Sequence, residues 1–333
     1  MSNLGPMETS AAERDVPPAR EIILTRRLSD RVFRGVVTAG GFVSLIVLGL
    51  IALFLASRSI DIFKTFGFHF ITGFKWDSGD PDNGIAPILG IGAMLIGTIV
   101  TALVGIVIAL PVSVGMALFL EYYLPGRLKK SLTMVIDLMA AIPSVIFGLW
   151  GFFVLMPHAI YWGKLLHKYF GWIPFLDVQA PIFERSPFIA GLVLSIMIIP
   201  IVTSISREVF SQVPLDRIQA AYALGATRWT MIKAVVLPFG SSGIAGGAML
   251  GLGRAMGETV AVYLVLNLYY QPNFQILFSA GGSVASMIVT KFGEAGKLEL
   301  QGLMAAGLVL FVVTLIINFL SNFIVKRASR TGQ

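Results

Sequence analysis

Arg254 and Glu258 are two ionisable residues, four positions apart, in the apolar run Gly251-Leu-Gly-Arg-Ala-Met-Gly-Glu-Thr-Val-Ala-Val262. Both flanks are apolar enough for a membrane helix, where a charge at the bilayer centre costs at least about 2.5–3.5 kcal/mol on insertion scales. On one helix the two side chains share a face, about 6 Å apart along the axis. A guanidinium donates a fork of hydrogen bonds suited to an oxyanion. The pair therefore either lines a path for an anion or forms a self-satisfied ion pair that sets helix register.

The elements that must position this pair belong to a membrane protein. The 333 residues are 56% hydrophobic and 13% charged, against about 25% charged in soluble domains, and the mean hydropathy is +0.83. We predict an all-α polytopic protein with six transmembrane helices. The expected spans lie near residues 35–57, 88–120, 131–156, 188–206, 238–267 and 302–325. Prolines at positions 111, 143 and 200 should bend or interrupt their helices.

The distribution of lysine and arginine predicts the orientation. The two tails and the segments 121–130 and 207–237 carry roughly twice as many of these residues as the opposite side. Both termini should therefore face the cytoplasm, on either side of a six-span domain at 35–325. Residues 1–34 indicate a disordered, basic cytoplasmic tail, and 326–333 a short C-terminal one.

Several kinds of chemistry are excluded by what the sequence lacks. There is no cysteine, so the chain has no disulfide, thiolate metal site or cysteine nucleophile. No Gly-x-x-x-x-Gly-Lys-[Ser/Thr] motif occurs, so the chain has no phosphate-cradling loop with which to hydrolyse ATP. The formal charge of +7 lies in segments flanking apolar runs, which argues against nucleic-acid binding. We expect a membrane protein that is not itself an enzyme and has no metal or cofactor of its own.

A second informative stretch is the polar segment before the fifth span, which we expect to form a cytoplasmic helix over 214–230. Pro214 marks its start, and Gly225 should end or turn it, because glycine adopts the left-handed conformation at little cost. Ile218, Ala221 and Tyr222 recur with Gly225 at three- and four-residue spacing and form a small apolar face. That face either docks into a groove of another protein or lies on the inner membrane surface.

Gln219-Ala-Ala-x-x-x-Gly225, followed by Leu237-Pro238, resembles the EAA loop of bacterial ABC importer permeases, in which a coupling helix sits in a cleft of the ATPase subunit. The sequence departs from the family pattern at Gln219, where the family has glutamate, and at Val235, where it has isoleucine. The resemblance implies that the coupling residues are Gln219, Ala220, Ala221, Gly225, Leu237 and Pro238. It also implies a MetI-like permease core.

The run around Arg254 and Glu258 resembles the signature of PstC-type permeases of phosphate ABC importers, as do Ala140-Ala-Ile-Pro-Ser-Val-Ile-Phe-Gly-Leu-Trp150, Ile85-Ala-Pro-Ile-Leu-Gly90 and Gly97-Thr98. This resemblance implies import of inorganic phosphate through a heterodimer with a PstA-type permease. Two PstB-type ATPases would bind ATP and Mg²⁺, and a PstS-type extracytoplasmic protein would deliver phosphate. In that setting Arg254 would stabilise phosphate in the path, and Glu258 would hold the arginine between transits.

Three other functions remain open on the sequence. The chain could be a permease for another oxyanion such as sulfate or molybdate, a secondary transporter or channel that needs no ATPase, or a membrane scaffold that senses phosphate status.

Glycines recur through the fifth span. Gly243, Gly247 and Gly251 are four residues apart, and Gly253 and Gly257 follow them. Small residues at this spacing let helix backbones approach closely in a membrane. We therefore expect this face to pack against neighbouring helices, including those of a partner permease.

Overall fold

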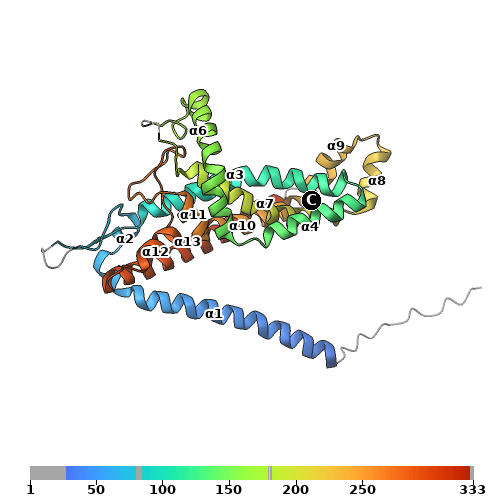
Figure 1. Cartoon of the computed structure of the whole chain (residues 1–333). Helices are drawn as coiled ribbons and strands as arrows, with labels where there is room; N and C mark the ends of the chain where they lie inside the picture. Colours follow the sequence, from blue (N-terminus) through green and yellow to red (C-terminus); the bar gives the residue numbers. More distant parts are fainter. Residues whose placement is uncertain (1–27, 80–84, 179, 181, 331–333) are drawn as a thin grey trace, which may run out of the picture. The chain divides into compact units, whose positions relative to one another are not determined.

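The computed structural model describes residues 28–79, 85–178, 180 and 182–330. The described chain is helical apart from one short hairpin and its loops (Figure 1). In the first half of the chain the elements are α1 (Leu28–Phe66), α2 (His69–Thr72), β1 (Trp76–Asp77), β2 (Ile88–Leu89), α3 (Gly92–Tyr122), α4 (Gly126–Ala140), α5 (Ser144–Trp150), the π-helix η2 (Gly151–Leu155) and α6 (Met156–Phe170). The later elements are α7 (Pro187–Ser211), α8 (Leu215–Ala223), α9 (Arg228–Met231), the π-helix η3 (Ile232–Val236), α10 (Leu237–Gly257), α11 (Val260–Val265), α12 (Val284–Phe292) and α13 (Lys297–Arg330).

The predicted number of membrane spans is confirmed. Six helices in the described ranges are long and apolar enough to cross a membrane: Leu28–Phe66, Gly92–Tyr122, Ser144–Phe170, Pro187–Ser211, Arg228–Gly257 and Lys297–Leu320. The bounds differ most for the first, third and fifth spans. The first reaches from Leu28 to Phe66 and is longer than the expected 35–57 at both ends. The third is Ser144–Phe170 and not 131–156, because the backbone leaves the helix at Pro143 and residues 131–140 belong to α4. The fifth begins at Arg228 and ends at Gly257, whereas 238–267 was expected.

The predicted tails lie mostly outside the described residues. Residues 28–34 of the expected N-terminal tail already belong to α1, and α13 continues to Arg330. The chain forms two units, residues 1–51 and 52–333. In its described part the first unit is the N-terminal portion of α1, where every residue from 28 to 51 is exposed. An apolar helix with this exposure is suited to lipid or to another membrane helix as its surroundings.

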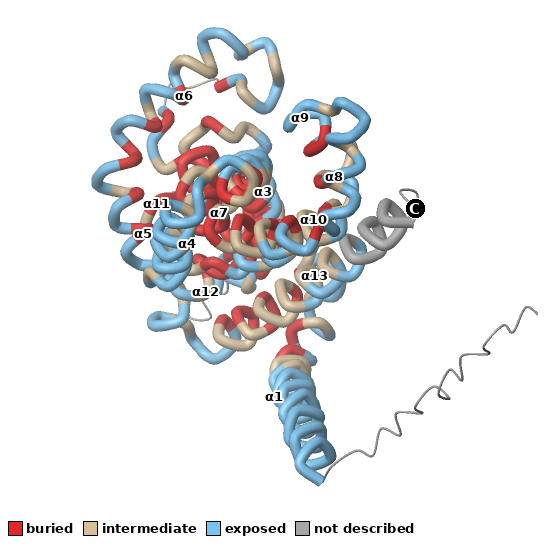
Figure 2. Tube along the Cα trace, turned by 90° about the vertical axis from the view of Figure 1, so that its right-hand side faces the viewer, coloured by how far each residue is buried: buried red, intermediate tan, exposed pale blue. Residues whose placement is uncertain are grey.

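The second unit is built around α7, which packs along α3 and against α10. Buried residues concentrate where these three helices meet, whereas α4 and α8 lie on the surface of the unit (Figure 2). Small residues permit the close packing. A Cβ added at Gly191 of α7 would overlap Val104 of α3, and one at Gly251 of α10 would lie 2.6 Å from Cγ2 of Ile198. The backbones approach closely because glycine stands at these crossings.

Prolines act differently at their three positions. Pro143 stands at the N-cap of α5, and the backbone between Ala140 and Ser144 leaves the helix there. Pro111 and Pro200 instead lie inside α3 and α7, which continue through them. A proline costs an intrahelical hydrogen bond inside a helix but not at its N-terminus, where the N–H has no partner in the helix. The expected interruption therefore occurs at Pro143, and no helix ends at the other two.

The two ends of the second unit are closed by different elements (Figure 1). At one end, which we call the α8–α9 end, α8 and α9 cover the termini of α3 and α7. At the opposite end the β1–β2 hairpin, α2 and α12 pack on the start of α3 and on α13. There Thr98 of α3 accepts a hydrogen bond from the backbone N–H of Val284 at 3.1 Å. This bond ties α3 to the start of α12.

Candidate functional site

The structure separates Arg254 and Glu258 into different local structures. Helix α10 ends at Gly257, and Glu258 has extended backbone angles of φ −70° and ψ 129°. Glu258 is buried, whereas Arg254 lies on the surface in the last turn of α10. The expectation that both side chains lie on one continuous helix face is therefore wrong. The helix stops one residue before the glutamate.

Side chains stabilise the break between α10 and α11. The Oε1 atom of Glu258 accepts a hydrogen bond from the backbone N–H of Ala261 at 3.4 Å, in the first turn of α11. The hydroxyl of Thr259 donates to the carbonyl oxygen of Gly257 at 3.2 Å. Helix ends leave backbone groups without intrahelical partners, and these two contacts satisfy one group on each side. Glu258 is thus a structural part of the break as well as a buried charge.

No ion pair joins Arg254 to Glu258 in the described residues, where pairs within 4.0 Å link Lys129 to Glu121 and Lys291 to Glu299. A self-satisfied Arg–Glu pair is consequently not the arrangement in this structure. The guanidinium lies at the C-terminal end of α10, where the helix dipole favours a positive charge. An exposed charge within an apolar span requires a polar surrounding such as a water-filled path.

A second helix interruption lies close to the first. The break at Pro143 precedes α5, and α5 packs against α11. A Cβ added at Gly148 of α5 would lie 2.8 Å from the Cα atom of Ala261. Broken helices are tolerated at membrane depth where their backbone is buried or lines a polar cavity, and transporters build sites there. The structure therefore places the helices that follow the two interruptions, α5 and α11, against each other.

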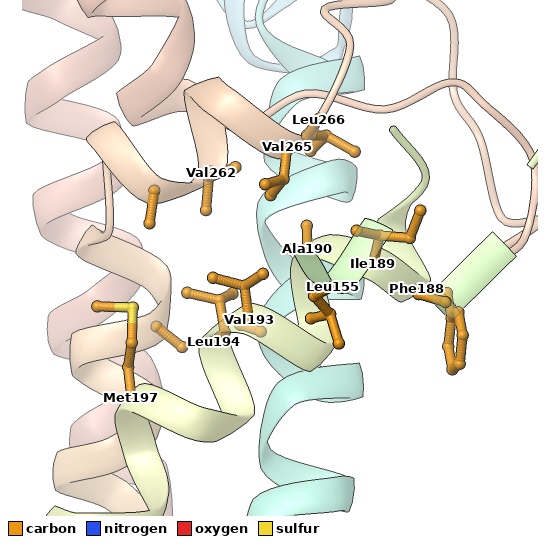
Figure 3. Packing of buried hydrophobic residues seen from close by; sticks show 14 of the residues in the cluster. Leu155, Phe188, Ile189, Ala190, Val193, Leu194, Met197, Val262, Val265 and Leu266 are labelled. Carbon is orange, nitrogen blue, oxygen red and sulfur yellow. The ribbon is translucent and has the colours of Figure 1, made fainter. Parts of the chain in front are cut away.

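Helix α11 is held against α7 by apolar contacts. Val262 and Val265 point toward Val193 and Leu194, and all four are buried (Figure 3). This packing places one side of the helix break on the most buried helix of the unit. Sequence reasoning missed the break. Gly257 followed by the β-branched Thr259 and Val260 was the available signal, and it is weak because membrane helices often contain glycine.

The predicted cytoplasmic helix is present as α8 and α9, joined by a turn at Gly225. Gly225 has φ +78°. Its N–H donates to the carbonyl of Tyr222 at 2.9 Å, and the N–H of Ala226 donates to the carbonyl of Ala221 at 3.1 Å. These two bonds form a Schellman motif, the usual helix ending with glycine in the left-handed conformation. The prediction that Gly225 ends or turns the helix is confirmed.

The faces of α8 differ from the expected ones. Ile218 and Ala221 face inward and pack on the apolar cluster that includes Phe210 and Met231. Gln219 and Ala220 are exposed, as are Leu215 (71%) and Leu224 (89%). Of the small apolar face that we expected to meet a partner or the membrane surface, Ile218 and Ala221 are therefore used within the chain, whereas Tyr222 and Gly225 are exposed. The surface open to a partner consists of the opposite side of α8 and its two leucines.

The α8–α9 segment is tied to the bundle by polar contacts. Arg228, the first residue of α9, donates to the carbonyl of Tyr122 at 3.1 Å and lies 5.2 Å from the ring centre of Tyr123. The hydroxyl of Tyr122 donates to the carbonyl of Phe210 at the end of α7 at 2.9 Å. These contacts join α9 to the end of α3, and α3 to the end of α7.

Leu237 and Pro238 begin α10 directly after the π-helix η3. A π-type turn widens the backbone, and a proline in the first turn of a helix needs no N–H partner. Leu237 packs against the cluster around Phe210, whereas Pro238 is exposed. Of the residues expected to couple to an ATPase, Ala221 and Leu237 therefore contact the chain itself, and the others are on its surface.

The glycines of α10 contact different helices. Gly243, Gly247 and Gly251 lie along α7, against Val209, Ile205 and Ile198 in turn. Gly253 lies near the side chain of Asn318 in α13, and no atom of the described structure lies within 4 Å of a Cβ at Gly257. The three glycines spaced four residues apart thus pack within this chain. At Gly257, beside the helix break, the surface of α10 is not covered by the described structure.

The turn at Gly225 permits a first prediction. Changing Gly225 to valine forces a β-branched residue into the left-handed region, which costs about 1–2 kcal/mol. Changing it to asparagine costs less, because asparagine visits this region more readily. No side chain would clash, since no described atom lies within 4 Å of the new Cβ. In thermal unfolding of the purified protein, Gly225→Val should lower the transition temperature more than Gly225→Asn. Equal effects would show that the turn conformation does not matter.

Known proteins resemble this chain in sequence and in fold. Residues 102–330 match the family described as binding-protein-dependent transport system inner membrane component. The chain is 41% identical over 308 residues to "Phosphate transport system permease protein PstC 2" of Mycobacterium tuberculosis (91% of this chain, 92% of the relative). It is 40% identical over 291 residues to "Phosphate transport system permease protein PstC" of Haemophilus influenzae (86% and 90%).

Among solved structures, a chain of a bacterial alginate ABC transporter, in complex with an alginate-bound periplasmic protein, matches with a TM-score of 0.57 at 17% identity. The match covers 91% of this chain and 98% of the other. At this identity the similarity concerns the fold alone, a MetI-like permease fold. The family match covers residues 102–330, which include the helix break and the α8–α9 segment. This chain therefore belongs to the binding-protein-dependent transport system inner membrane components, a family of multi-pass inner membrane permeases.

Proposed function

We propose that this chain is a transmembrane permease subunit of an ATP-driven importer of inorganic phosphate. The observation that carries the proposal is the 41% identity, over 91% of the chain, to a permease of a phosphate transport system. The exposed guanidinium of Arg254 beside a helix break supports it, since such a group suits a phosphate oxyanion in a low-dielectric path.

In the proposed path, phosphate passes the helix interruptions at Glu258 and at Pro143. Arg254 donates hydrogen bonds to the phosphate oxygens as the anion passes. Glu258 keeps the start of α11 in place through Ala261 and adds a negative charge beside the path. This chain would provide a route and charge compensation, with no bond made or broken in the substrate.

Coupling to ATP hydrolysis uses the exposed side of α8. Its two exposed leucines and the neighbouring Gln219 form a mixed surface that fits a groove on an ATPase. The ATPases would bind ATP and Mg²⁺, and their closure would move α8 and α9. The contacts of Arg228 and Tyr122 would pass that movement to α3 and α7. The bundle would then open outward and receive phosphate.

The complete importer would contain a PstA-type permease, a PstB-type ATPase dimer and a PstS-type phosphate-binding protein. Both termini and the α8–α9 end would face the cytoplasm, as the lysine and arginine distribution predicts. The opposite end, with the β1–β2 hairpin and α12, would then face the binding protein.

Two measurements test this function. Affinity purification of the tagged chain from its native membrane should recover an ATPase and a second permease. The reconstituted complex with its binding protein should take up labelled phosphate only with ATP. Excess unlabelled phosphate should compete, and sulfate or molybdate should not. Competition by sulfate alone would favour the other oxyanion permease, and uptake without an ATPase would favour a secondary transporter.

A further inference from the structure

We propose that Arg185 and Asn267 form a second anion site, which holds the phosphate group of a ligand in a cavity at the outer end of α11. The cavity has a volume of about 290 Å³, which is the volume that roughly ten molecules occupy in liquid water. Its polar side chains are Arg185, Asn267 and Tyr263, and the other side chains that line it are apolar. The inference rests on the proposed function, because it adds a receiving site to the same path.

Arg185 is held in a specific position. It is the one non-glycine residue of the described chain with a positive φ, at +46°. Such a conformation is uncommon for an arginine and clusters at functional sites. Asn267 supports it twice: its backbone N–H donates to the carbonyl of Arg185 at 3.4 Å, and its Oδ1 atom accepts from Nη1 at 3.3 Å. Asn267 in turn donates to Ser279 at 3.2 Å.

The charge of Arg185 is not neutralised by this support. Its guanidinium lies 5.1 Å from the ring centre of Phe152, and its hydrogen-bond partner is a neutral amide. No ion pair within 4.0 Å joins it to a carboxylate in the ranges that the structure describes. One nitrogen serves Asn267, so other N–H donors of the fork remain for a ligand. A half-buried cation with neutral partners attracts an anion into the cavity.

The cavity is connected to the helix break by α11. Glu258 precedes this helix and Asn267 follows it, and six helical residues span about 9 Å. Two arginines, Arg185 and Arg254, therefore lie near the two ends of one short element. An anion released by a binding protein would meet Arg185 first and Arg254 second.

The ligand chemistry is a tetrahedral phosphate group, which a guanidinium and an amide donor can hold together. Two sources can supply it: free inorganic phosphate, or the headgroup of a phospholipid, since apolar side chains also line the cavity. Both would need the same positive charge at Arg185. They differ in whether the complex binds phosphate after all phospholipid has been removed.

The binding test uses the complete complex, purified without phospholipid. The complex carries Arg254→Gln, so that Arg254 does not contribute to phosphate binding. Inorganic phosphate should raise its thermal transition temperature. Adding Arg185→Gln should weaken the apparent phosphate affinity by about tenfold or more. Arg185→Lys should retain part of the affinity, because the charge remains. If phosphate gives no shift, native mass spectrometry should instead find a phospholipid that the wild-type complex retains and the Arg185→Gln complex loses.

The transport test compares Arg185→Gln with Lys164→Gln, which removes an exposed charge from the same proposed side of the membrane. At limiting phosphate-loaded binding protein, Arg185→Gln should reduce uptake by about tenfold, and Lys164→Gln should leave it unchanged. Equal binding and uptake in the two variants, with phosphate import intact, would overturn the site but leave the proposed function standing. A wild-type complex that imports sulfate and not phosphate would overturn the proposed function, and the binding test with sulfate would then decide the role of Arg185.

Discussion

Replacing Arg254 by glutamine should reduce phosphate uptake by the assembled complex by about 100-fold. A hydrogen bond from a charged donor contributes about 1.5–3 kcal/mol, and the upper end of that range corresponds to about this factor. Arg254 is exposed at the end of α10 and has no carboxylate partner in the described structure, so its loss should not disturb packing. Arg254→Lys should be intermediate, since lysine keeps the charge and loses the fork. Uptake in proteoliposomes with ATP and loaded binding protein is the measurement.

Glu258 should respond differently from Arg254, because it also supports the helix break. Glu258→Gln retains an oxygen that accepts from the N–H of Ala261 and removes only the charge. We expect it to lower uptake by about tenfold while the complex assembles normally. Glu258→Ala removes the acceptor as well and should reduce both assembly and uptake.

The control for both arginine variants is Lys297→Gln, which removes an exposed charge at the start of α13. It should transport as the wild type does. Membrane levels and co-purification of partner subunits must match before uptake rates are compared. Unimpaired uptake in both Arg254→Lys and Glu258→Gln would remove the two residues from the path. An equal loss in Lys297→Gln would mean that the complex responds to any loss of positive charge.

Replacing Gly97 by alanine should strongly destabilise the folded protein. A Cβ at this position would overlap the backbone carbonyl oxygen of Gly282, which has φ +142° and adjoins the start of α12. Overpacking of this kind costs about 1–3 kcal/mol and occasionally more, and a backbone atom yields less readily than a side chain. The adjacent bond from Val284 to Thr98 should weaken as α12 moves away. The expected result is a lower thermal transition and a smaller folded yield.

The same substitution elsewhere on α3 provides a matched control. Gly115 is exposed, and no described atom lies within 4 Å of a Cβ built there. Gly115→Ala should therefore be neutral or slightly stabilising, since alanine favours a helix over glycine. If Gly97→Ala unfolds at the same temperature as Gly115→Ala, the close approach of α3 to Gly282 is not a feature of the folded protein.

Local features of the chain were predictable, because short segments encode them. Six spans follow from runs of apolar residues, whose length is set by the bilayer. The turn at Gly225 follows from one glycine after a helical stretch, since its Schellman motif uses only residues 221–226. None of these features depends on a distant partner.

Other features depend on contacts that local sequence does not specify. The helix pattern of α8 groups Ile218 with Ala221, but it does not say whether that face meets Phe210 of the same chain or another protein. The end of α10 at Gly257 was missed, because the apolar run resumes at Val260 after two polar residues and Glu258 finds its hydrogen-bond partner in α11. Arg185 and Asn267 are 82 positions apart, so their contact required the fold.

By itself, the sequence determined that this is a six-span membrane protein, that Arg254 and Glu258 interrupt an apolar run, and where the polar segment before that run turns. Each of these depends on the properties of neighbouring residues: hydropathy, charge and the conformational freedom of glycine. Only the tertiary structure decided that Arg254 and Glu258 are divided by a helix break, that the glycine stripe faces α7, and that Arg185 is held by Asn267. Those outcomes depend on which helices pack together, and the free energy of that packing is shared among residues far apart in the chain.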